Sequence, residues 1–263
     1  MARPNPHRPF TPDPAQATLA PAISGDAING LGEAQKRRAR MVYWAPNPDD
    51  IPHGGLQRWF YTRNADDPHI AKARADRAAI LAAEIAPLAE TRVERSPEGW
   101  TAAFLAMAGA GDFEMAGVAE MRPEYLLEGA EAPERRVLMI GVAHDYDAIS
   151  EAPATRAGGE VVRQYGRAAA AAKQVAGWLR SQGWEARPVT GPMTGEILMI
   201  PPALECGFGE LGKHGSIISD AHGSSFRLSA VLTDAPFAPT PRREFGADEF
   251  CTNCRVCEDA CPR

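Results

Sequence analysis

The sequence lacks several features that would assign the chain to a common class. Its best apolar runs, residues 137–143 and 197–200, have the length of buried strands and fall well short of the roughly 18 residues that span a bilayer. Its 34 acidic and 28 basic residues give a formal net charge of -6, without the basic excess typical of nucleic-acid binding. No apolar export segment follows the paired Arg37 and Arg38. We therefore expect a cytoplasmic protein with no transmembrane segment and no nucleic-acid partner.

Cysteine is scarce until the end of the chain, where it becomes dense. Cys206 precedes a group of four that lie within eleven residues: Cys251, Cys254, Cys257 and Cys261. Their spacing, C-x2-C-x2-C-x3-C followed by proline, is typical of ferredoxin-type [4Fe–4S] ligation. A structural zinc site usually takes two separated ligand pairs, and a disulfide framework spreads its cysteines along a short secreted chain. The pattern therefore favours an iron–sulfur cluster over zinc or no metal, and reduced thiols agree with a cytoplasmic location.

The fourth cysteine of the group predicts a second cluster. In two-cluster ferredoxins the last cysteine of such a run ligates the other cluster, and no further cysteine follows Cys261. We therefore expect Cys251, Cys254 and Cys257 to hold the first cluster, and Cys261 to serve a second whose other ligands lie beyond Arg263. On this interpretation the chain is a C-terminally truncated part of a longer protein with two [4Fe–4S] clusters.

Apolar periodicity predicts the main elements of the fold. Helices are expected over residues 68–94, 98–107 and 157–182, and strands over residues 136–142, 184–188 and 226–233. On the first helix, Arg77 falls at helical spacing within the apolar stripe of Ile70, Ala73 and Ile80. On the third helix, Tyr165 falls on the inward face, where filling the core is its simplest role. The alanines around Tyr165 leave room for another element or for a flat cofactor.

The chain divides into three segments. Residues 1–40 begin with many prolines and predict an irregular arm, residues 41–235 form the body, and residues 236–263 form a proline-rich linker and the cysteine segment. Within the last strand of the body, F-R-L-S-A-V-L-T, Arg227 is the one charge. Surface exposure is the default for such an arginine, whereas a buried one needs a partner such as an anion or a phenol oxygen.

Two loops are candidates for ligand binding. Residues 207–215, G-F-G-E-L-G-K-H-G, hold four glycines, which let the backbone approach a ligand closely, although the pattern matches neither common nucleotide-binding motif. Further upstream, aromatic side chains lie among prolines and glycines. They either line a pocket for a flat ligand or pack as ordinary core: Tyr43, Trp44, Trp59, Phe60 and Tyr61.

The order of three motifs resembles a known family. The stretch G-F-G-E-L-G-K-H-G-S-I-I is followed by F-R-L-S-A-V-L-T-D-A-P, a short proline-rich connection, and C-T-N-C-R-V-C-E-D-A-C-P. This series resembles the corrinoid-dependent reductive dehalogenases of the cytoplasmic, catabolic type and, more distantly, epoxyqueuosine reductase. The resemblance is specific over residues 136–263.

The resemblance implies an α+β fold, in which a corrinoid-binding mixed sheet flanked by helices precedes the start of a ferredoxin-like [4Fe–4S] module. Cobalamin would lie between the sheet and that module, and the glycine-rich loop is assigned to it: Gly212, Lys213, His214, Gly215 and Ser216. The substrate would be a small organohalide. A redox partner or a fused reductase domain would supply the electrons.

The resemblance also implies two catalytic residues. The family's proton donor is a tyrosine near the start of a helix, matched by Tyr165, and its basic partner lies on the strand before the linker, matched by Arg227. These residue types suit the chemistry, because a phenol can protonate the carbon that loses halogen and a cation stabilises the remaining phenolate. The aromatic residues upstream favour a halogenated aromatic substrate.

Two alternatives stay open. An epoxyqueuosine reductase-like corrinoid iron–sulfur enzyme would carry a carboxylic acid near Tyr165, whereas here Gly166 and Arg167 are followed by alanines. A non-catalytic iron–sulfur electron-transfer or corrinoid-binding protein would hold a cofactor but would turn over no halide.

Overall fold

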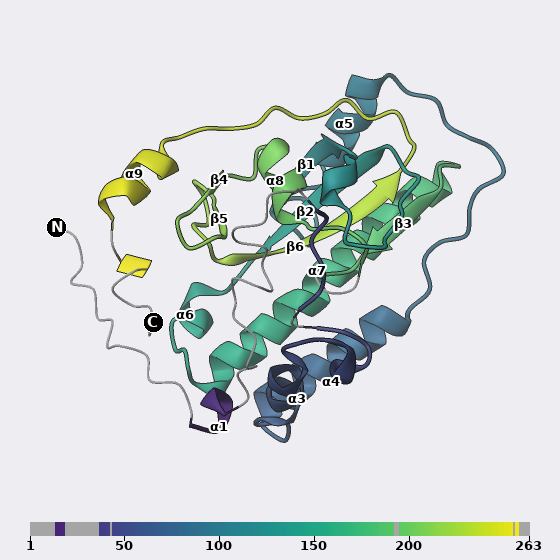
Figure 1. The fold of residues 1–263 in the computed structure, drawn as a ribbon. Coiled ribbons are helices and arrows are strands. Elements are labelled where there is room, and N and C mark those ends of the chain that lie inside the picture. Colours follow the sequence, from purple (N-terminus) through teal and green to yellow (C-terminus); the bar gives the residue numbers. More distant parts are fainter. Residues whose placement is uncertain (1–13, 19–36, 43, 192–194, 255, 258–263) are drawn as a thin grey trace.

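The computed structural model describes residues 14–18, 37–42, 44–191, 195–254 and 256–257. Its centre is a four-stranded sheet with the strand order β1-β2-β6-β3. Figure 1 shows helices around this sheet, whose strands are β1 (Met115–Glu120), β2 (Arg136–Ala143), β6 (Phe226–Thr233) and β3 (Ala186–Val189). The three predicted strands are confirmed, with β3 displaced by one or two residues.

The sheet is antiparallel at each of its described pairings, so the prediction of a mixed sheet was wrong. β6 pairs antiparallel with β2 on one side and with β3 on the other, and β1 pairs antiparallel with β2. β2 and β3 therefore run in the same direction and are joined by a helical crossover, but β6 is inserted between them, as in a split βαβ unit. Sequence order hides this insertion, because β6 follows both of its neighbours in the chain.

One face of the sheet is covered by the long helix α7 (Thr155–Ser181) and by α5 (Pro97–Leu105), whose N-cap is Ser96. The Ser96 hydroxyl accepts a hydrogen bond from the backbone N–H of Gly99 at 3.1 Å, which satisfies one free donor at the helix start. The small residues of α7 are buried against the large apolar residues of β2 and β6, so the predicted inward face is confirmed: Ala168, Ala172, Val175 and Leu179 against Leu138, Ile140 and Val231.

Helix α4 (Pro68–Ala82) packs on the outer side of α7 (Figure 1). The two helices approach closely at Gly159, where an added Cβ would lie 2.9 Å from the Cβ of His69. The small residues of α7 therefore allow the sheet to pack closely on one side of the helix and α4 to pack closely on the other. This matches the first of the two roles predicted for them, close packing of another element.

Helix α4 is shorter than predicted, because it ends at Ala82 and not near residue 94. The ammonium of Lys173 donates hydrogen bonds to the carbonyls of Ile80 at 2.8 Å, Leu81 at 2.6 Å and also Ala83, which satisfies acceptors at the helix end. Pro87 disfavours helical backbone at the residue before it. The segment after α4 then follows the end of α7.

The other face of the sheet is covered by α8 (Ile200–Glu205) and by a two-stranded hairpin of β4 (Glu210–Leu211) and β5 (Ile217–Ile218). Its core contains Met139, Leu232, Phe208 and Cys206. The remaining helices are α1 (Pro14–Ala17), α3 (Gly54–Thr62), α6 (Tyr146–Ile149) and α9 (Ala247–Asn253), with the 3-10 turns η1 (Pro48–Asp50) and η2 (Pro123–Tyr125). Most of the predicted irregular arm, residues 1–40, lies outside the described residues.

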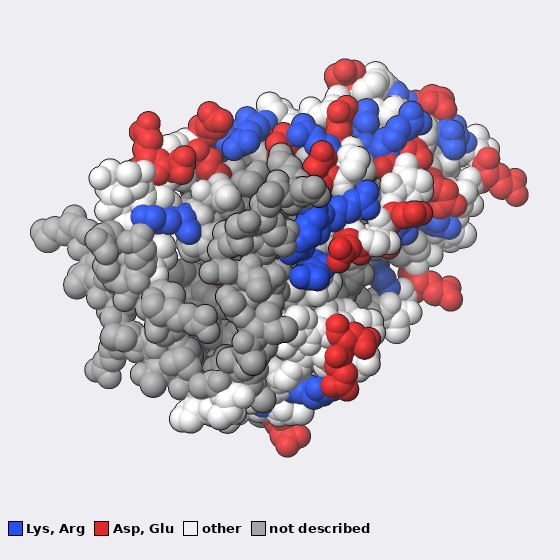
Figure 2. Space-filling model, viewed as in Figure 1, with Lys and Arg blue, Asp and Glu red and all other residues white. Residues whose placement is uncertain are grey.

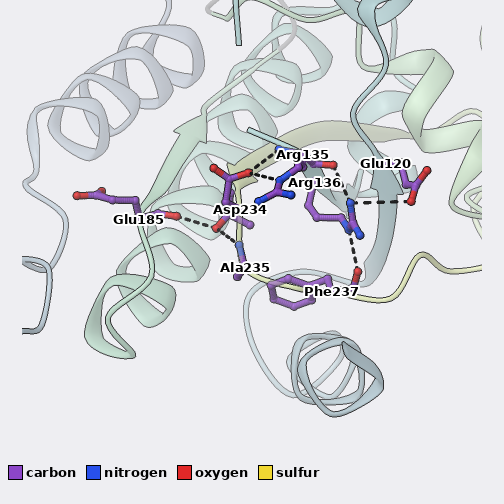
Figure 3. A network of polar contacts seen from close by, with 8 residues as sticks. Glu120, Arg135, Arg136, Glu185, Asp234, Ala235 and Phe237 are labelled. Carbon is purple, nitrogen blue, oxygen red and sulfur yellow. Dashed lines mark hydrogen bonds and ion pairs between the residues drawn. The ribbon is translucent and has the colours of Figure 1, made fainter. Parts of the chain in front are cut away.

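The linker after β6 leads to α9 (Figure 1), and hydrogen bonds fix its first part to the body. A network of polar contacts holds its first residues, in which the Arg136 Nε donates to the Phe237 carbonyl at 2.8 Å and Asp234 accepts from the Arg135 backbone N–H at 3.0 Å (Figure 3). The Phe237 side chain is fully buried. Further along, the Thr240 backbone N–H donates to the Val118 carbonyl of β1 at 2.9 Å.

Charges of both signs are interspersed on the face shown in Figure 2, where basic side chains lie beside acidic ones. Many of them form surface ion pairs, such as Arg135 with Asp234 at 3.3 Å. Such exposed pairs contribute little to stability, about 0–1 kcal/mol each. Among the helices in the described ranges, none combines the length and the apolar character that a membrane span requires.

Candidate functional site

A cavity of about 400 Å³ lies between α3, α4, α7 and the start of β6. The volume is within the range typical of small-molecule sites. Its wall is mostly apolar and is rich in aromatic rings, contributed by Trp44, Phe60, Tyr61 and Tyr165. Three arginines complete it: Arg74, Arg77 and Arg227. No aspartate or glutamate is among the described residues that line it.

The structure brings the two predicted catalytic residues together in this cavity. The Cζ atom of Arg227 lies 4.7 Å from the centre of the Tyr165 ring, so the guanidinium contacts the ring face. β6 presents Arg227 toward α7 because residues 227, 229, 231 and 233 alternate onto that face. Arg227 is partly exposed and its Nε is buried, so of the two environments considered for it the structure supports the one with a partner, here the Tyr165 ring.

Arg77 is a residue of the cavity to which the sequence analysis gave no function. Its Cζ lies 5.8 Å from the centre of the same Tyr165 ring, and its Nε is buried without a hydrogen-bond partner. The sequence held one indication of this placement. Arg77 falls within the apolar stripe of α4, where an arginine is unusual unless it faces a partner.

His144 lies just outside the cavity lining and is coupled to Arg227. Burial and the positive charge of Arg227 lower the pKa of His144 to about 4, so the imidazole is neutral near pH 7. Its Nδ1 lies 3.3 Å from the Ser225 hydroxyl, while its Nε2 is buried without a partner. The sequence showed a polar segment after β2, but nothing in it indicated that this histidine meets Arg227.

This lowered pKa predicts a loss of stability in acid. The unfolded chain binds a proton at His144 below pH 6.5, but the folded chain binds one only near pH 4, so stability falls as the pH drops through this interval. The unfolding free energy lost over this interval is about 2 kcal/mol, a value reduced for the partial exposure of His144 to solvent. His144→Asn should flatten the dependence of unfolding free energy on pH between 6.5 and 4, as measured by urea denaturation. His222→Asn, at a partly exposed histidine, is the control, and equal slopes for both variants and the parent would contradict the assignment.

The start of α7 is held by a buried carboxylate. Glu160 is 4% exposed and accepts hydrogen bonds from the Asp145 backbone N–H, the Gln164 amide and the Arg163 Nε, each at 2.7 Å. Burial alone would raise its pKa, but these hydrogen bonds lower it. The negative charge of Glu160 is thus stabilised by three hydrogen-bond donors. This network fixes the turn of α7 that precedes Tyr165.

The aromatic wall was predicted in part. Phe60 and Tyr61 come from α3, and Trp44 from the segment before it, while Tyr43 lies outside the described residues. The Trp44 Nε1 donates to the Tyr61 hydroxyl at 3.2 Å, which fixes the two rings relative to each other. Trp59 does not line the cavity and instead contacts Arg63.

The predicted corrinoid loop lies away from this cavity, at the turn of the β4–β5 hairpin. It runs from the buried Gly212 through the exposed Lys213, His214, Gly215 and Ser216. The His214 Nδ1 accepts a hydrogen bond from the Ser216 backbone N–H at 3.0 Å, and Gly215 has a φ of 79°. An added Cβ on Gly215 would meet nothing within 4 Å, so the backbone of the turn is open to a ligand.

The glycine at 209 has a structural explanation. An added Cβ there would lie 2.1 Å from the carbonyl oxygen of Ile218, and its φ is 151°. The two strands of the hairpin can meet only if this position has no side chain. At least one glycine of this loop is therefore required by the hairpin and not by a ligand.

The cysteine segment begins in α9. Cys251 lies within α9, Cys254 directly after it and Cys257 shortly beyond, all three partly exposed and free, while Cys261 lies outside the described residues. Among the described residues, no three metal-ligating side chains converge on one point. Thiolates are the ligands that [4Fe–4S] clusters take, and Cys261 is predicted to serve a second cluster. The cluster and the ferredoxin-like module stay predictions.

Glu210 joins the glycine-rich hairpin to the cysteine-bearing helix. Its carboxylate accepts hydrogen bonds from the backbone N–H groups of Phe245 and Ala247, each at 2.9 Å. These hydrogen bonds lower the pKa of Glu210, so it is charged at neutral pH. The start of α9 is therefore fixed against β4.

We expect Glu210→Ala to release α9 from the hairpin. Two backbone donors lose their charged acceptor, and a hydrogen bond to a charged group is stronger than one between neutral groups. Hydrogen exchange at the amides of residues 245–250 should rise at least tenfold while exchange in β2 stays unchanged. Glu244→Ala, which removes an exposed carboxylate that pairs with Arg242 at 3.8 Å, is the matched control. Unchanged exchange in Glu210→Ala would show that α9 is held by other contacts.

Cys206 is separate from the cysteine segment. Its thiol is buried against β1 and donates to the Ala203 carbonyl at 3.5 Å, and burial raises its pKa far above the ordinary value. A thiol in this environment is inert and serves packing. This agrees with its position outside the spaced group of four.

Comparison with known proteins shows where the chain has relatives. No protein-family model matches it. It is 35% identical over 156 residues to the tetrachloroethene reductive dehalogenase of Dehalobacter restrictus, which covers 59% of this chain and 28% of that protein. It is 29% identical over 159 residues to the epoxyqueuosine reductase of Synechococcus sp., which covers 56% of this chain and 44% of that protein. The chain thus spans less than half the length of these relatives.

Solved structures show the same fold. The catabolic reductive dehalogenase NpRdhA superposes with a TM-score of 0.65 at 20% identity, over 73% of this chain and 30% of that one. A reductive dehalogenase whose structure suggests a mechanism for B12-dependent dehalogenation superposes with a TM-score of 0.61 at 20% identity, over 82% and 31%. The chain is therefore a homologue of the reductive dehalogenases with their fold, and it has a more distant similarity to epoxyqueuosine reductase. The resemblance predicted from the sequence is confirmed.

Proposed function

We propose that this chain is the corrinoid- and substrate-binding part of a reductive dehalogenase. One observation carries the proposal: in a homologue of these enzymes, Tyr165 and Arg227 meet in an apolar cavity of about 400 Å³. Such a cavity with a few convergent polar groups is the usual form of a small-molecule site. Residues 41–235 would form this part, and residues 236–263 would lead to the electron-transfer module.

The reaction defines what the side chains must do. Replacing halogen by hydrogen consumes two electrons and one proton and releases halide. The Tyr165 hydroxyl is the proton donor of the cavity, because no carboxylic acid is among the described residues that line it. Arg227 is placed to stabilise the phenolate that remains, since a nearby cation favours the charged form of a phenol.

The cofactors belong to the proposal. Bound cobalamin would supply the reducing cobalt chemistry. The turn of Gly212, Lys213, His214, Gly215 and Ser216 is where we expect part of the corrinoid to bind, because its backbone is accessible at Gly215. Cys251, Cys254 and Cys257, with Cys261, are the residues that would hold iron–sulfur clusters, two of them in the complete protein. A redox partner or a fused reductase domain would then deliver electrons.

The aromatic wall favours an aromatic organohalide as substrate. Trp44, Phe60 and Tyr61 surround the space in front of Tyr165. Aromatic rings pack well against other rings in offset or edge-on arrangements. Reduction of an epoxide, as in epoxyqueuosine reductase, is less well supported, because no carboxylic acid is among the described residues that line this cavity.

Anaerobic reconstitution tests the proposal. The complete protein that carries this chain is loaded with cobalamin, iron and sulfide, and its cobalt, iron and sulfide contents are measured before halide release is assayed. We expect one cobalt, eight iron atoms from two clusters, and release of halide from a chlorinated aromatic compound. Cobalt and iron binding without halide release from any organohalide would favour an electron-transfer or corrinoid-binding protein. A reconstituted protein that contains no cobalt would contradict the proposal.

A further inference from the structure

His144 lies beside Arg227 on the face of the sheet that α7 covers. In the ladder between β2 and β6, Val142 pairs directly with Arg227. The ladder continues one step past the end of β2, where the His144 backbone N–H donates to the Ser225 carbonyl at 2.9 Å. Side chains alternate along a strand, so His144 projects to the same side as Val142, which packs in the core beneath α7. His144 and Arg227 are therefore diagonal neighbours on one face, a spacing that long side chains can bridge.

Each of these two side chains buries a nitrogen that lacks a partner. In the described part of the chain, neither the Nε of Arg227 nor the Nε2 of His144 forms a hydrogen bond. An arginine Nε can only donate, whereas the Nε2 of a neutral histidine accepts when the ring proton is on Nδ1. An unsatisfied buried donor and an unsatisfied buried acceptor each cost stability, and two such neighbours can satisfy each other.

The surroundings of His144 favour the tautomer that accepts at Nε2. Its Nδ1 lies 3.3 Å from the Ser225 hydroxyl, which can accept from a protonated Nδ1 or donate to an unprotonated one. The charged groups that act on the imidazole are Arg227 of β6 with Glu160 and Arg163 of α7. Glu160 already accepts from three donors, so a proton on Nε2 would face a guanidinium that has only donors. Burial and the charge of Arg227 also keep the imidazole neutral near pH 7, because they lower its pKa to about 4.

We propose that His144 is a positioning residue for Arg227. In the working enzyme, rotation about side-chain bonds lets the Nε2 of His144 accept from the Arg227 Nε, and this hydrogen bond holds the guanidinium beside the Tyr165 ring. The role rests on the proposed function, in which Arg227 stabilises the phenolate. A cation serves this purpose best when it is already in place as the negative charge develops. Arg227 is partly exposed, so without the hydrogen bond its guanidinium could turn toward solvent.

The tautomer of His144 tests this role without turnover. The complete protein is labelled at histidine with an NMR-active nitrogen isotope, and long-range nitrogen–proton spectra then show which ring nitrogen carries the proton. The signals of His144 are identified by their loss in His144→Gln. We expect the proton on Nδ1 near pH 7, with Nε2 free to accept. A proton on Nε2 would overturn the role, because two donors cannot hydrogen-bond to each other.

Two variants then separate the two nitrogens of the imidazole. The side-chain amide of glutamine reaches as far as Nε2, whereas that of asparagine reaches only as far as Nδ1. His144→Asn should lower kcat for halide release by roughly tenfold with little change in KM, because the lost hydrogen bond acts on charge that develops in the transition state. His144→Gln should keep kcat within about threefold of the parent, since it retains an acceptor for Arg227. A purely structural role through Ser225 would reverse this order, because asparagine preserves the contact at Nδ1.

Solvent exchange of the Arg227 Nε–H gives a matching readout that needs no substrate. In protein labelled at arginine, this proton should exchange roughly tenfold faster in His144→Asn than in His144→Gln, as expected for the loss of its acceptor. His69→Gln is the control, because His69 is exposed on α4 and lies outside the cavity lining, and it should change neither the exchange nor kcat. Equal exchange or equal kcat in the two His144 variants would overturn the role.

The two proposals fail separately. If the reconstituted protein releases halide from no organohalide, the dehalogenase proposal is wrong, while the tautomer and the exchange rates still decide whether His144 holds Arg227. If halide is released and the proton lies on Nε2 of His144, the reaction stands and the positioning role is wrong. The readouts therefore distinguish an error about the reaction from an error about the residue.

Discussion

Tyr165→Phe is expected to lower the rate of halide release by about 10²- to 10⁴-fold, the usual contribution of a positioned general acid. The substitution removes the proposed proton donor but keeps the ring that Arg77 and Arg227 contact. In the described residues no hydrogen bond to the Tyr165 hydroxyl is formed, so its loss should change stability little. The effect should fall mainly on kcat, because the hydroxyl is needed for proton transfer and not for the fit of the ring.

The comparison requires the reconstituted protein and two controls. Tyr146→Phe makes the same chemical change on α6, where the tyrosine is 67% exposed, and should leave the rate unchanged. The cobalt and iron contents of all variants must be equal, which separates a chemical effect from poor loading. If Tyr165→Phe keeps a rate within a few-fold of the parent, the proton comes from another donor.

Phe237→Ala is expected to cost about 3–5 kcal/mol of unfolding free energy, the range for truncating a buried aromatic residue. The Phe237 side chain is fully buried and packs against Trp100, Phe104 and Trp178, with ring centres 5.7, 6.2 and 6.5 Å away. The same residue ends the polar network of Figure 3 and anchors the start of the linker. The loss should therefore reach both the core and the linker.

Urea denaturation of parent and variant measures this loss. Phe245→Ala is the matched control in the same linker, because its ring is 42% exposed and its truncation should cost less than about 1 kcal/mol. Similar values for the two variants would mean that the linker is not part of the cooperative core. A large loss confined to Phe237→Ala would show that the linker and the sheet unfold together.

Local features of the fold were predictable from the sequence. The serine at 96 followed by proline marks the start of α5, and the apolar run of β2 and the periodic face of α7 are set by residues close together in the chain. The end of α4 was missed because the ammonium that satisfies its carbonyls, on Lys173, lies 90 or more residues away. The insertion of β6 was missed for the same reason: strand neighbours are a long-range property.

The site was predictable in part and by a different route. Tyr165 and Arg227 were paired through family resemblance, and the structure places them together, although the contact is to the ring face and not to the hydroxyl. Arg77 lay in an apolar stripe, but only the packing of α4 on α7 shows which ring it faces. His144 reached the site through the pairing of β2 with β6, which the sequence does not reveal.

The insertion of β6 between β2 and β3 determines when the cavity can form. Synthesis delivers Tyr165 on α7 well before Arg227 on β6, and until β6 arrives the edges of β2 and β3 that it will occupy have no strand partner between them. β6, the last strand among the described residues, is thus the one that closes the sheet and supplies the cation. Any fragment that ends before residue 226 would keep most helices of this fold but would leave a gap in its sheet, with an incomplete binding site and exposed strand edges prone to aggregation.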